Sequence, residues 1–407
     1  MLSKIANFIN KYYPAAVAGL ILFLVGIWVG QNATLGFLKT GSARTPVSLS
    51  NRASPSGVTV DFGEFWNVWD KVTKEHLDKK GVDQQKLLYG AIGGLVNSLG
   101  DPYTVFLDPE NNKSFNSELS GVYEGVGIEI GSKDGRLLVI APISGSPAGK
   151  AGVLASDVIA KIDGKDTSSM TIPDAVKAIR GQAGTNIKLT LLRDGKAIEL
   201  DLKRAKITVK SVDFVDKGAG VALIKISRFG DTTKDEWSDA INKFVSEGFS
   251  KLILDLRNDP GGRLDTAVYV LGEFVKTGTV MVQEEDANGL RQEFKSDREG
   301  RLQAVTPVIL VNKGSASASE IVAGGLRDLL GSKLVGEKSF GKGTVQKVED
   351  LTKGAGLHIT VAKWLTPKGT WVNANGGLSV DFEVKLTEAD IASGKDPQLA
   401  KALSLVK

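Results

Sequence analysis

The chain has 407 residues, a formal net charge of +4, two histidines and no cysteine. This length allows two or three domains with sizeable cores. Charge is nearly balanced and no basic tract is interleaved with aromatic residues, so the sequence gives no indication of nucleic-acid binding. Without cysteine there can be no disulfide or thiolate metal site, and two distant histidines argue against a metal site held by side chains alone. We expect no metal and no cofactor.

The N-terminal segment predicts a membrane anchor. Lys4 and Lys11 precede an uncharged stretch at residues 12–38, whose core at residues 15–30 is apolar throughout. That length spans or nearly spans a hydrocarbon layer, and lysines before it place the N-terminus in the cytoplasm. A buried core helix would show a polar face, which this stretch lacks. We expect residues 1–39 to form a cytoplasmic tip and an uncleaved signal anchor; a cleaved signal peptide is the alternative.

Residues 40–58 predict a flexible linker. They are rich in Ser, Thr, Pro and Gly and carry no periodic apolar pattern. Such a segment behaves as an extended, mobile tether. If the anchor is correct, everything after it lies outside the cytoplasm, in the periplasm or at the cell exterior, and the chain is a bacterial cell-envelope protein.

Residues 59–119 predict a helical region. Apolar side chains follow the three-and-four spacing of an amphipathic helix at Phe62, Phe65, Trp66, Trp69 and Val72. A second helix is indicated by Asp83 as N-cap and by apolar residues up to Leu99, and it should end at residues 100–102. Two exposed tryptophans would be costly, so this pair of helices should pack on something. The two helices would pack either in a dimer interface or as a cap on the same chain; the sequence is consistent with both.

Residues 120–206 predict a small β-rich module. Five β-like runs, at residues 127–130, 137–141, 158–162, 187–192 and 198–202, surround a helix that begins near Thr171. With SPAGKAGVLASDVIAKIDG in its middle, the module resembles a bacterial PDZ domain. The resemblance implies that a peptide adds as a strand and that backbone N–H groups capture its terminal carboxylate. The residues at the head of the module would form this peptide site: Gly125, Val126, Gly127 and Ile128.

Arg180 stands at the end of the helix of this module. It could contact the following domain and help to switch activity. A solvated arginine is the simpler interpretation.

From residue 207 the pattern changes to that of an α/β domain. Strand-like runs at residues 221–226 and 251–256 flank an amphipathic helix, and Arg257-Asn258-Asp259-Pro260-Gly261-Gly262 follows the second run. Loops that follow parallel strands and precede helices are where such sheets place their sites. Pro-Gly-Gly alone would more often be only a structural turn.

The most informative stretch runs from residue 307 to residue 346. A short strand at residues 307–311 leads through a turn of small residues around Ser317 into a helix. This arrangement presents a serine hydroxyl at a helix N-terminus. A second strand leads to Gly341-Lys342-Gly343 and then to Gln346. The glycines would let Lys342 approach a reacting hydroxyl, and Gln346 would share its face of an extended segment.

Each of these residues also has a simpler interpretation. Ser317 followed by Glu320 is a capping-box pattern. Lys342 alone would be a solvated surface lysine, with turn glycines beside it.

In combination, the runs GSASASEIVAGGL and VGEKSFGKGTVQ resemble the carboxyl-terminal processing (tail-specific) proteases, serine peptidases that use a Ser–Lys dyad. The spacings of 25 from Ser317 to Lys342 (342 − 317) and of 4 to Gln346 (346 − 342) match that family. The resemblance covers nearly everything after about residue 60. It implies that Ser317 is the nucleophile, Lys342 the general base and Gln346 the residue that orients it. It also implies an oxyanion hole made by the N–H of Gly261 or Gly262 together with that of Ala318.

The chemistry of the residues agrees with this resemblance. A serine hydroxyl is a poor nucleophile until a neighbouring base takes its proton. We expect both histidines, His76 and His358, to be packing or surface residues. A Ser–His–Asp triad therefore has little to draw on, and a lysine base is the economical alternative. The pKa of that lysine must fall from about 10.4 towards 7–8, which desolvation can achieve. Lys342 should therefore be buried, with no carboxylate beside it.

The expected architecture is α/β plus β. After the anchor and the helical segment, a PDZ domain precedes a protease core of the ClpP/crotonase type at residues 207–407. The expected function is a membrane-anchored serine endopeptidase that binds substrates with free apolar C-termini and cleaves near them, with a homodimer as the expected assembly. The alternatives are an inert PDZ adaptor on a protease-like scaffold and a Ser–Lys hydrolase of small acyl substrates.

Overall fold

The computed structural model describes residues 57 and 59–406 with gaps at 134, 144, 388, 391 and 392. It contains two compact units, residues 1–80 and residues 81–407. None of the helices in the described part of the chain is long and apolar enough to cross a membrane. The expected anchor and nearly all of the expected linker lie outside the described residues, so both stay predictions.

The described part of the first unit is dominated by one helix, α2 (Gly63–Glu75). The aromatic side chains predicted to share one face contact one another, with Phe65 and Trp66 at 5.0 Å and Trp66 and Trp69 at 6.3 Å between ring centroids. The expected amphipathic helix is therefore confirmed, although it begins later than residue 60. His76 follows it in an exposed position, and its Nδ1 accepts a hydrogen bond from the Asp78 N–H.

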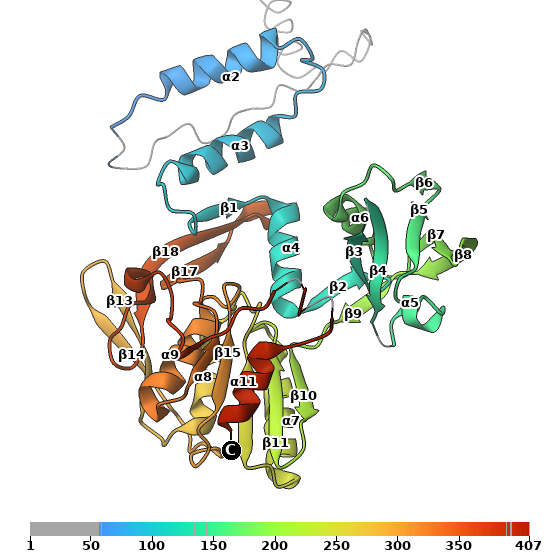
Figure 1. Cartoon of the computed structure of the whole chain (residues 1–407). Coiled ribbons are helices and arrows are strands. Elements are labelled where there is room, and N and C mark those ends of the chain that lie inside the picture. Colours follow the sequence, from blue (N-terminus) through green and yellow to red (C-terminus); the bar gives the residue numbers. More distant parts are fainter. Residues whose placement is uncertain are drawn as a thin grey trace, which may run out of the picture. The chain divides into compact units, whose positions relative to one another are not determined.

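The second unit begins with α3 (Gln84–Asn97), whose N-cap is Asp83 as predicted. Strand β1 (Val105–Leu107) and helix α4 (Pro109–Ser120) follow, and α4 stops at Gly121, which adopts a left-handed conformation. The sequence analysis did not identify α4, because PENNKSFNSELS carries too few apolar residues to show a helical period. Figure 1 shows α4 leading from β1 to β2.

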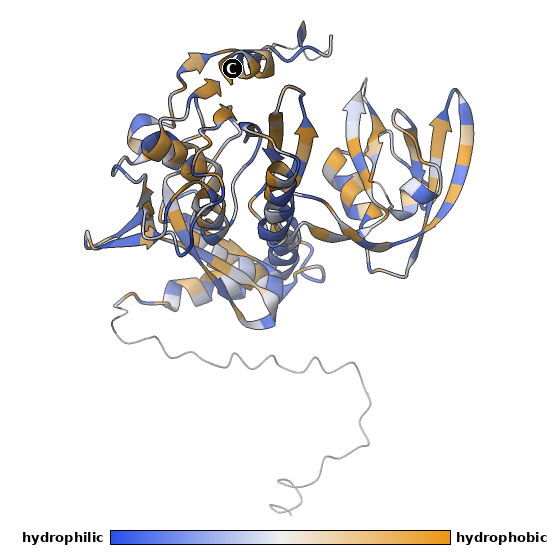
Figure 2. Cartoon of the chain, turned by 90° about the horizontal axis from the view of Figure 1, so that it is seen from below, coloured by the Kyte–Doolittle hydropathy of each residue, from blue (hydrophilic) through white to orange (hydrophobic). Residues whose placement is uncertain are grey.

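The β-rich module has the predicted strands and helix. Its sheet has the order β3-β4-β5-β7-β8, and β6 pairs with β5. In Figure 2, its outer strands alternate between hydrophobic and hydrophilic residues, as expected when only one face of a strand is buried. A separate two-stranded ribbon of β2 and β9 links the module to the core. The elements are β2 (Val122–Gly125), β3 (Ile128–Lys133), β4 (Arg136–Pro142), α5 (Pro147–Lys150), β5 (Val158–Ile162), β6 (Lys165–Asp166), α6 (Ile172–Ile179), β7 (Asn186–Arg193), β8 (Lys196–Lys203) and β9 (Ala205–Thr208).

The core is built on a six-stranded sheet of order β10-β11-β12-β15-β16-β19, parallel except for β10. Helices cover both faces of this sheet. On one face, apolar side chains of the strands pack against α7, α8 and α9; on the other face, they pack against α11. This explains why β11 and β15 consist almost entirely of apolar residues. The elements are β10 (Val212–Asp216), β11 (Val221–Ile226), α7 (Thr233–Ser246), β12 (Lys251–Asp255), α8 (Leu264–Leu271), η1 (Gly272–Phe274), β15 (Val308–Val311), α9 (Ala318–Leu330), β16 (Leu334–Gly336), β19 (Phe382–Glu383) and α11 (Pro397–Leu405).

A second, antiparallel sheet stands beside the first. Its order is β1-β18-β13-β14, and β17 also pairs with β18. Strands β17 (Thr344–Asp350) and β18 (Gly356–Leu365) form a hairpin, and β13 (Val280–Asp286) pairs with β14 (Arg291–Lys295). Two short 3₁₀ helices, η2 (Thr352–Gly354) and η3 (Val372–Asn375), complete the connections. Because β1 pairs with β18, the segment before the β-rich module becomes part of the core.

Candidate active site

Three loops meet at one edge of the parallel sheet. Strands β12, β15 and β16 are neighbours in the sheet, and their carboxyl ends lead to Gly261-Gly262, to Ser317 and to Lys342 respectively. Carboxyl ends of parallel strands share an edge, which is where α/β sheets place their sites. A cavity of about 970 Å³ is lined by these four residues and by Gln346. The structure thus brings the predicted nucleophile, base and glutamine together.

Ser317 occupies a strained turn. Its φ is 55° and its ψ is −115°, a combination that residues other than glycine rarely adopt. Such strain costs about 1–3 kcal/mol and persists only where surrounding contacts impose it. The contacts are present: the Ala316 N–H and the Ser319 hydroxyl donate to the carbonyl oxygen of Asp259, at 3.0 and 2.9 Å. The expected sharp strand-to-helix turn is therefore confirmed.

The Gly261-Gly262 loop lies directly against this turn. Gly261 has φ of 96°, and a Cβ on it would lie 2.6 Å from the Ala316 carbonyl oxygen and 2.9 Å from the Ser317 Cβ. Gly262 has φ of 141°, and a Cβ there would overlap the Phe229 carbonyl. Glycine is therefore required at both positions by the close approach of other backbone.

The two glycines differ in what their N–H groups do. The Gly261 N–H donates to Asp259 Oδ1 at 2.8 Å. Within the described residues, the N–H groups of Gly262 and of Ala318, the first residue of α9, have no acceptor. Of the two glycines that the sequence left open, only Gly262 therefore keeps a free N–H.

The carboxyl of Asp259 is buried beneath the same turn. Asp259 is 0% exposed, and its Oδ2 has no hydrogen-bond partner among the described residues. Burial raises the pKa of Asp259 to about 8, and the hydrogen bond from Gly261 and the charge of Arg228 only partly oppose this effect. Asp259 thus orients both the glycine loop, through its carboxyl, and the Ser317 turn, through its carbonyl.

Lys342 reaches the cavity from the loop after β16. Its side chain is half-buried, burial lowers the pKa of its amine, and Asp101 has a smaller opposing effect. Across the described part of the chain, the amine forms no ion pair and no hydrogen bond, including none to the Ser317 hydroxyl. Lys342 is therefore only partly desolvated in the cavity, whereas full burial without the influence of a carboxylate had been expected.

The flanking glycines serve a purpose different from the expected one. A Cβ on Gly341 would lie 2.8 Å from the Gly377 nitrogen, and a Cβ on Gly343 would meet the side chains of Trp371 and Asn373. The glycines therefore let the lysine loop pass a neighbouring segment, at residues 371–377. The sequence analysis had attributed them to close approach between Lys342 and the serine.

Gln346 lines the same cavity but does not bond to Lys342 in this structure. Its Nε2 donates to the hydroxyls of Thr344 at 2.9 Å and Thr360 at 3.1 Å. A register shift between Val345 and Gln346 interrupts the simple alternation of side chains along β17 on which the expected contact depended. The Gln346 amide oxygen stays available as an acceptor.

Glu320 joins the nucleophile loop to the base loop, a role that sequence reasoning missed. Its Oε2 accepts from the backbone N–H groups of Ser317 at 3.0 Å and Lys342 at 2.9 Å. Its Oε1 accepts from the Ser339 hydroxyl at 2.5 Å and the Gly341 N–H at 2.7 Å. The sequence identified Glu320 only as a capping-box partner; the bond to the Ser317 N–H is that interaction, and the other three require the folded chain.

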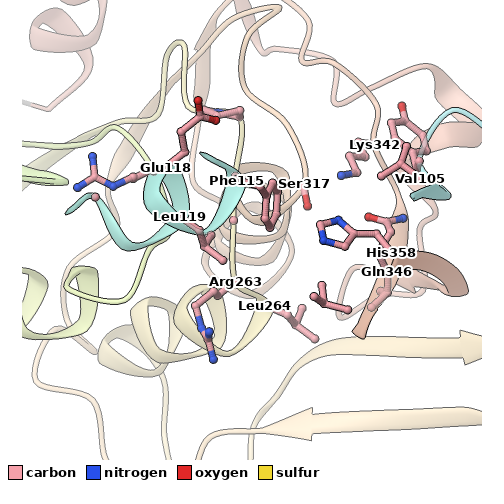
Figure 3. A pocket seen from close by; sticks show the side chains of 18 of the residues that line it. Val105, Phe115, Glu118, Leu119, Arg263, Leu264, Ser317, Lys342, Gln346 and His358 are labelled. Atoms are coloured by element: carbon pink, nitrogen blue, oxygen red, sulfur yellow. The ribbon is translucent and has the colours of Figure 1, made fainter. Parts of the chain in front are cut away.

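His358 is a packing residue, as expected, and it also lines the cavity. It is buried on β18, lines the cavity, and packs edge-on against Phe115 of α4 with ring centroids 4.5 Å apart. Burial, followed by the charge of Lys342, lowers the pKa of its imidazole. Figure 3 shows Ser317, Lys342 and Gln346 pointing into one space, with the His358 ring beside them.

The residues predicted to bind peptide lie in a separate place, at the edge of the β-rich module. The carbonyl groups of Val126 and Gly127 accept hydrogen bonds from the N–H groups of Ala148 and Ile143, both at 2.9 Å. Gly127 has φ of 75°, and a Cβ there would overlap Ser146, so the turn requires glycine. Gly125 ends β2, and Ile128 begins β3, the edge strand of the sheet.

Arg180 lies at the end of α6, with its guanidinium 4.9 Å from the centroid of the Tyr123 ring. It also lines the cavity that contains Ser317. From the sequence, a solvated arginine was the simpler interpretation. In the structure, the Arg180 side chain is partly buried at the cavity wall.

Comparison with known proteins agrees with this architecture. The profile of peptidase family S41 matches residues 220–384, that of the PDZ domain matches residues 138–193, and that of the activating protease CtpB N-terminal domain matches residues 29–111.

Two curated relatives are similar over much of the chain. The carboxy-terminal processing protease CtpA of Bacillus subtilis (strain 168) is 37% identical over 357 residues, which cover 88% of this chain and 75% of that protein. A probable CtpA-like serine protease of Staphylococcus aureus (strain N315) is 39% identical over 313 residues, 76% of this chain and 62% of that protein.

Among solved structures, a protein described as a putative S41 protease from Bacteroides fragilis NCTC 9343 has a TM-score of 0.56. The two are 14% identical, and the match covers 87% of this chain and 98% of the other. At that identity the likeness concerns the fold alone.

Proposed function

Because the chain belongs to the carboxyl-terminal processing serine proteases of peptidase family S41, we propose that it is a Ser–Lys endopeptidase that binds protein C-termini and cleaves near them. The observation that carries this proposal is the meeting of Ser317, Lys342 and Gln346 in one cavity at the carboxyl edge of the sheet. The reaction passes through an acyl-enzyme and needs no cofactor.

In the proposed mechanism the Ser317 hydroxyl attacks the scissile carbonyl while the neutral Lys342 amine takes its proton. Lys342 then returns the proton to the leaving amine, and water hydrolyses the acyl-enzyme. The depressed pKa of Lys342 supports this role, because a larger fraction of the amine is neutral than at an exposed lysine. The Gln346 amide oxygen is the group that would orient the amine when substrate is bound.

The oxyanion of the tetrahedral intermediate would be held by the free N–H groups of Gly262 and Ala318. Both belong to loops fixed by backbone contacts, so they need not reorganise during the reaction. Gly261 contributes in another way, since its N–H is engaged by Asp259 and its lack of a Cβ keeps the Ser317 turn accessible.

The PDZ domain would bind the C-terminus of the substrate and present the chain to the catalytic site. Its turn at residues 125–128 offers backbone N–H groups for a terminal carboxylate, and β3 offers a free edge for strand addition. The position of Arg180 on the cavity wall supports a role in coupling the PDZ domain to the catalytic site.

We further propose that the protein is anchored in the membrane by residues 1–39 and acts outside the cytoplasm. This proposal rests on the uncharged stretch at residues 12–38 and the lysines before it. The exposed apolar residues on α2 and α3 support a homodimer formed through the N-terminal helices. They include Phe62, Val68, Val72, Leu88 and Leu95.

Recognition of the C-terminus is tested by peptides that differ only in a free or an amidated end. With the purified full-length chain, amidation is expected to raise KM by about 10–100-fold, because it removes a hydrogen-bonded charge worth about 1.5–3 kcal/mol. The value of kcat should change little, since the PDZ site lies away from Ser317. Equal kcat/KM for both peptides would exclude capture of the carboxylate.

The same assay separates the alternatives. An inert PDZ adaptor would bind the free-acid peptide without cleaving it. A hydrolase of small acyl substrates would cleave an activated ester yet show no preference between the two peptides.

Glu320→Gln is expected to lower kcat by about 10²-fold, as a displacement of about 1 Å in a catalytic group can do. The amide keeps the shape of the carboxyl but carries donors, so it cannot accept all four hydrogen bonds that join the Ser317 and Lys342 loops. Steady-state kinetics of the variant checks this, with Glu299→Gln as the exposed control. Unchanged kcat in Glu320→Gln would show that the four bonds do not set the geometry of the dyad.

A further inference from the structure

The Lys342 amine rests against an aromatic ring that comes from outside the protease sequence motifs. Its Nζ lies 4.9 Å from the centroid of the Tyr103 ring. Tyr103 belongs to the turn between α3 and β1, in the segment that precedes the PDZ domain. Both residues line the cavity with Ser317. In the described chain, the ring is the one group for which a direct contact of this amine is found.

The turn that carries Tyr103 is firmly built. Asp101 accepts hydrogen bonds from the Tyr103 N–H at 3.0 Å and from the Thr104 hydroxyl at 2.6 Å. The Thr104 oxygen in turn accepts from the Thr360 N–H on β18 at 3.0 Å, and Thr104 is 4% exposed. The residues that follow the turn are attached to the same sheet, because β1 pairs with β18. The ring is therefore held in place by the second sheet of the core.

The same contacts extend to Gln346. Its Nε2 donates to the Thr360 hydroxyl at 3.1 Å, and the Thr360 N–H donates to Thr104. The lysine and the glutamine of the proposed site thus both depend on the turn at residues 101–104. The turn thus reaches the amine of Lys342 through the Tyr103 ring and the amide of Gln346 through Thr360.

We propose that the turn at residues 101–104 completes the site of the catalytic base: the Tyr103 ring holds the protonated Lys342 amine, and Asp101 holds the turn that carries this ring. The inference deepens the proposed Ser–Lys function and rests on it. Tyr103 is a positioning residue, because it acts on the reaction through Lys342.

The physical effect depends on the protonation state of the lysine. A ring face attracts an ammonium group and has little attraction for a neutral amine. The protonated Lys342 is therefore held on Tyr103, and the amine is released towards Ser317 once it is neutral. Both the ring and the charge of Asp101 favour the protonated form, in opposition to burial, which favours the neutral one.

Other titratable groups face the lysine loop and stay unchanged in the test. His358 approaches from β18, and burial and Lys342 lower its pKa. Glu320 approaches from α9 and bonds to the backbone N–H of Lys342. Neither contacts the turn at residues 101–104 through a hydrogen bond or ion pair in the described part of the chain.

The test is the pH dependence of kcat/KM for cleavage of a free-acid tail peptide by the full-length chain. The rate should rise with pH as Lys342 loses its proton. In Tyr103→Leu the acid limb should move down by about 0.5–1 pH unit, since the ring attraction that favoured the ammonium is lost. The plateau kcat should change little, because the amine is already neutral there and the ring has little attraction for it.

Two further variants and one control identify the cause of the shift in the acid limb. Tyr103→Phe keeps the ring and should keep the wild-type pH profile. Asp101→Asn removes the negative charge and should also move the acid limb down, whereas Asp83→Asn, at the N-cap of α3, should not move it. If Tyr103→Leu fails to fold, the Asp101→Asn profile decides.

An acid limb that stays in place in both Tyr103→Leu and Asp101→Asn would overturn the inference, as would equal shifts of the limb in Tyr103→Leu and Tyr103→Phe. Lys342→Met, measured in the same series, separates this result from failure of the proposed function. If Lys342→Met cleaves as well as wild type, the Ser–Lys mechanism itself is wrong. If Lys342→Met is inactive while the turn variants behave as wild type, only the role of the turn is wrong.

Discussion

Ser317→Ala is expected to reduce peptide cleavage by about 10⁴–10⁶-fold, the loss found when the nucleophile of a serine protease is removed. The residual rate would come from the oxyanion donors and from substrate binding alone. Alanine keeps the Cβ and can occupy the same strained turn, which is held by Asp259 and not by the hydroxyl. The fold should therefore survive, and the loss should appear in kcat.

Binding provides the control for this variant. The affinity for a fluorescent free-acid peptide should be unchanged, because the PDZ site at residues 125–128 is separate from Ser317. Ser246→Ala, at an exposed serine of α7, should cleave as wild type does. Proteolysis retained in Ser317→Ala would assign the nucleophile to another group and end the proposed mechanism.

Lys342→Met is expected to lower kcat by about 10²–10⁴-fold, the usual contribution of a positioned general base. Methionine fills much of the space of the lysine stem but cannot take a proton. Lys342→Arg should be nearly as inactive, because a guanidinium stays protonated at any working pH. A matched control is Lys347→Met, five positions later on β17, where the side chain is exposed and paired with Glu349.

The pH profile adds a second measurement for the same residue. Only the neutral amine can accept the proton of Ser317, so activity should rise with pH through the pKa of Lys342. Burial lowers that pKa, and the midpoint of the rise should accordingly lie below the value of an exposed lysine. The rise should vanish in Lys342→Met, and a flat profile in the wild type would argue against Lys342 as the base.

Much of the fold followed from local patterns. The parallel strands β11, β12 and β15 are apolar because both of their faces are buried, and such runs stand out in a sequence. The N-caps at Asp83 and Thr171 marked the starts of α3 and α6, since a cap needs only the few residues next to it. Helix α4 was not predicted, because its stabilising contacts are with other elements and its own residues are mostly polar.

The residues of the candidate site also fall into two groups: those that local patterns identify and those that only the folded chain identifies. Ser317, Lys342 and Gln346 could be named from motif spacing, because they stand within one short stretch of chain. Asp259 could be seen only as part of a turn, since its burial depends on the packing of two loops. His358 packs as expected, but its place on the cavity wall could not be foreseen, because a strand pattern does not reveal which residues will line a cavity. Tyr103 lies in a part of the chain that no catalytic pattern singles out.

The sequence by itself determined that a PDZ domain precedes the protease core, determined the strand–turn–helix unit that carries Ser317, and pointed to Lys342 as the candidate base. These features depend on residues that are close along the chain, so local periodicity and spacing are sufficient to recognise them. Only the tertiary structure decided which glycine N–H stays free, how Glu320 joins two loops, and which ring the lysine amine contacts. Each of those depends on groups brought together by the pairing of distant strands, and sequence spacing carries no information about such distances.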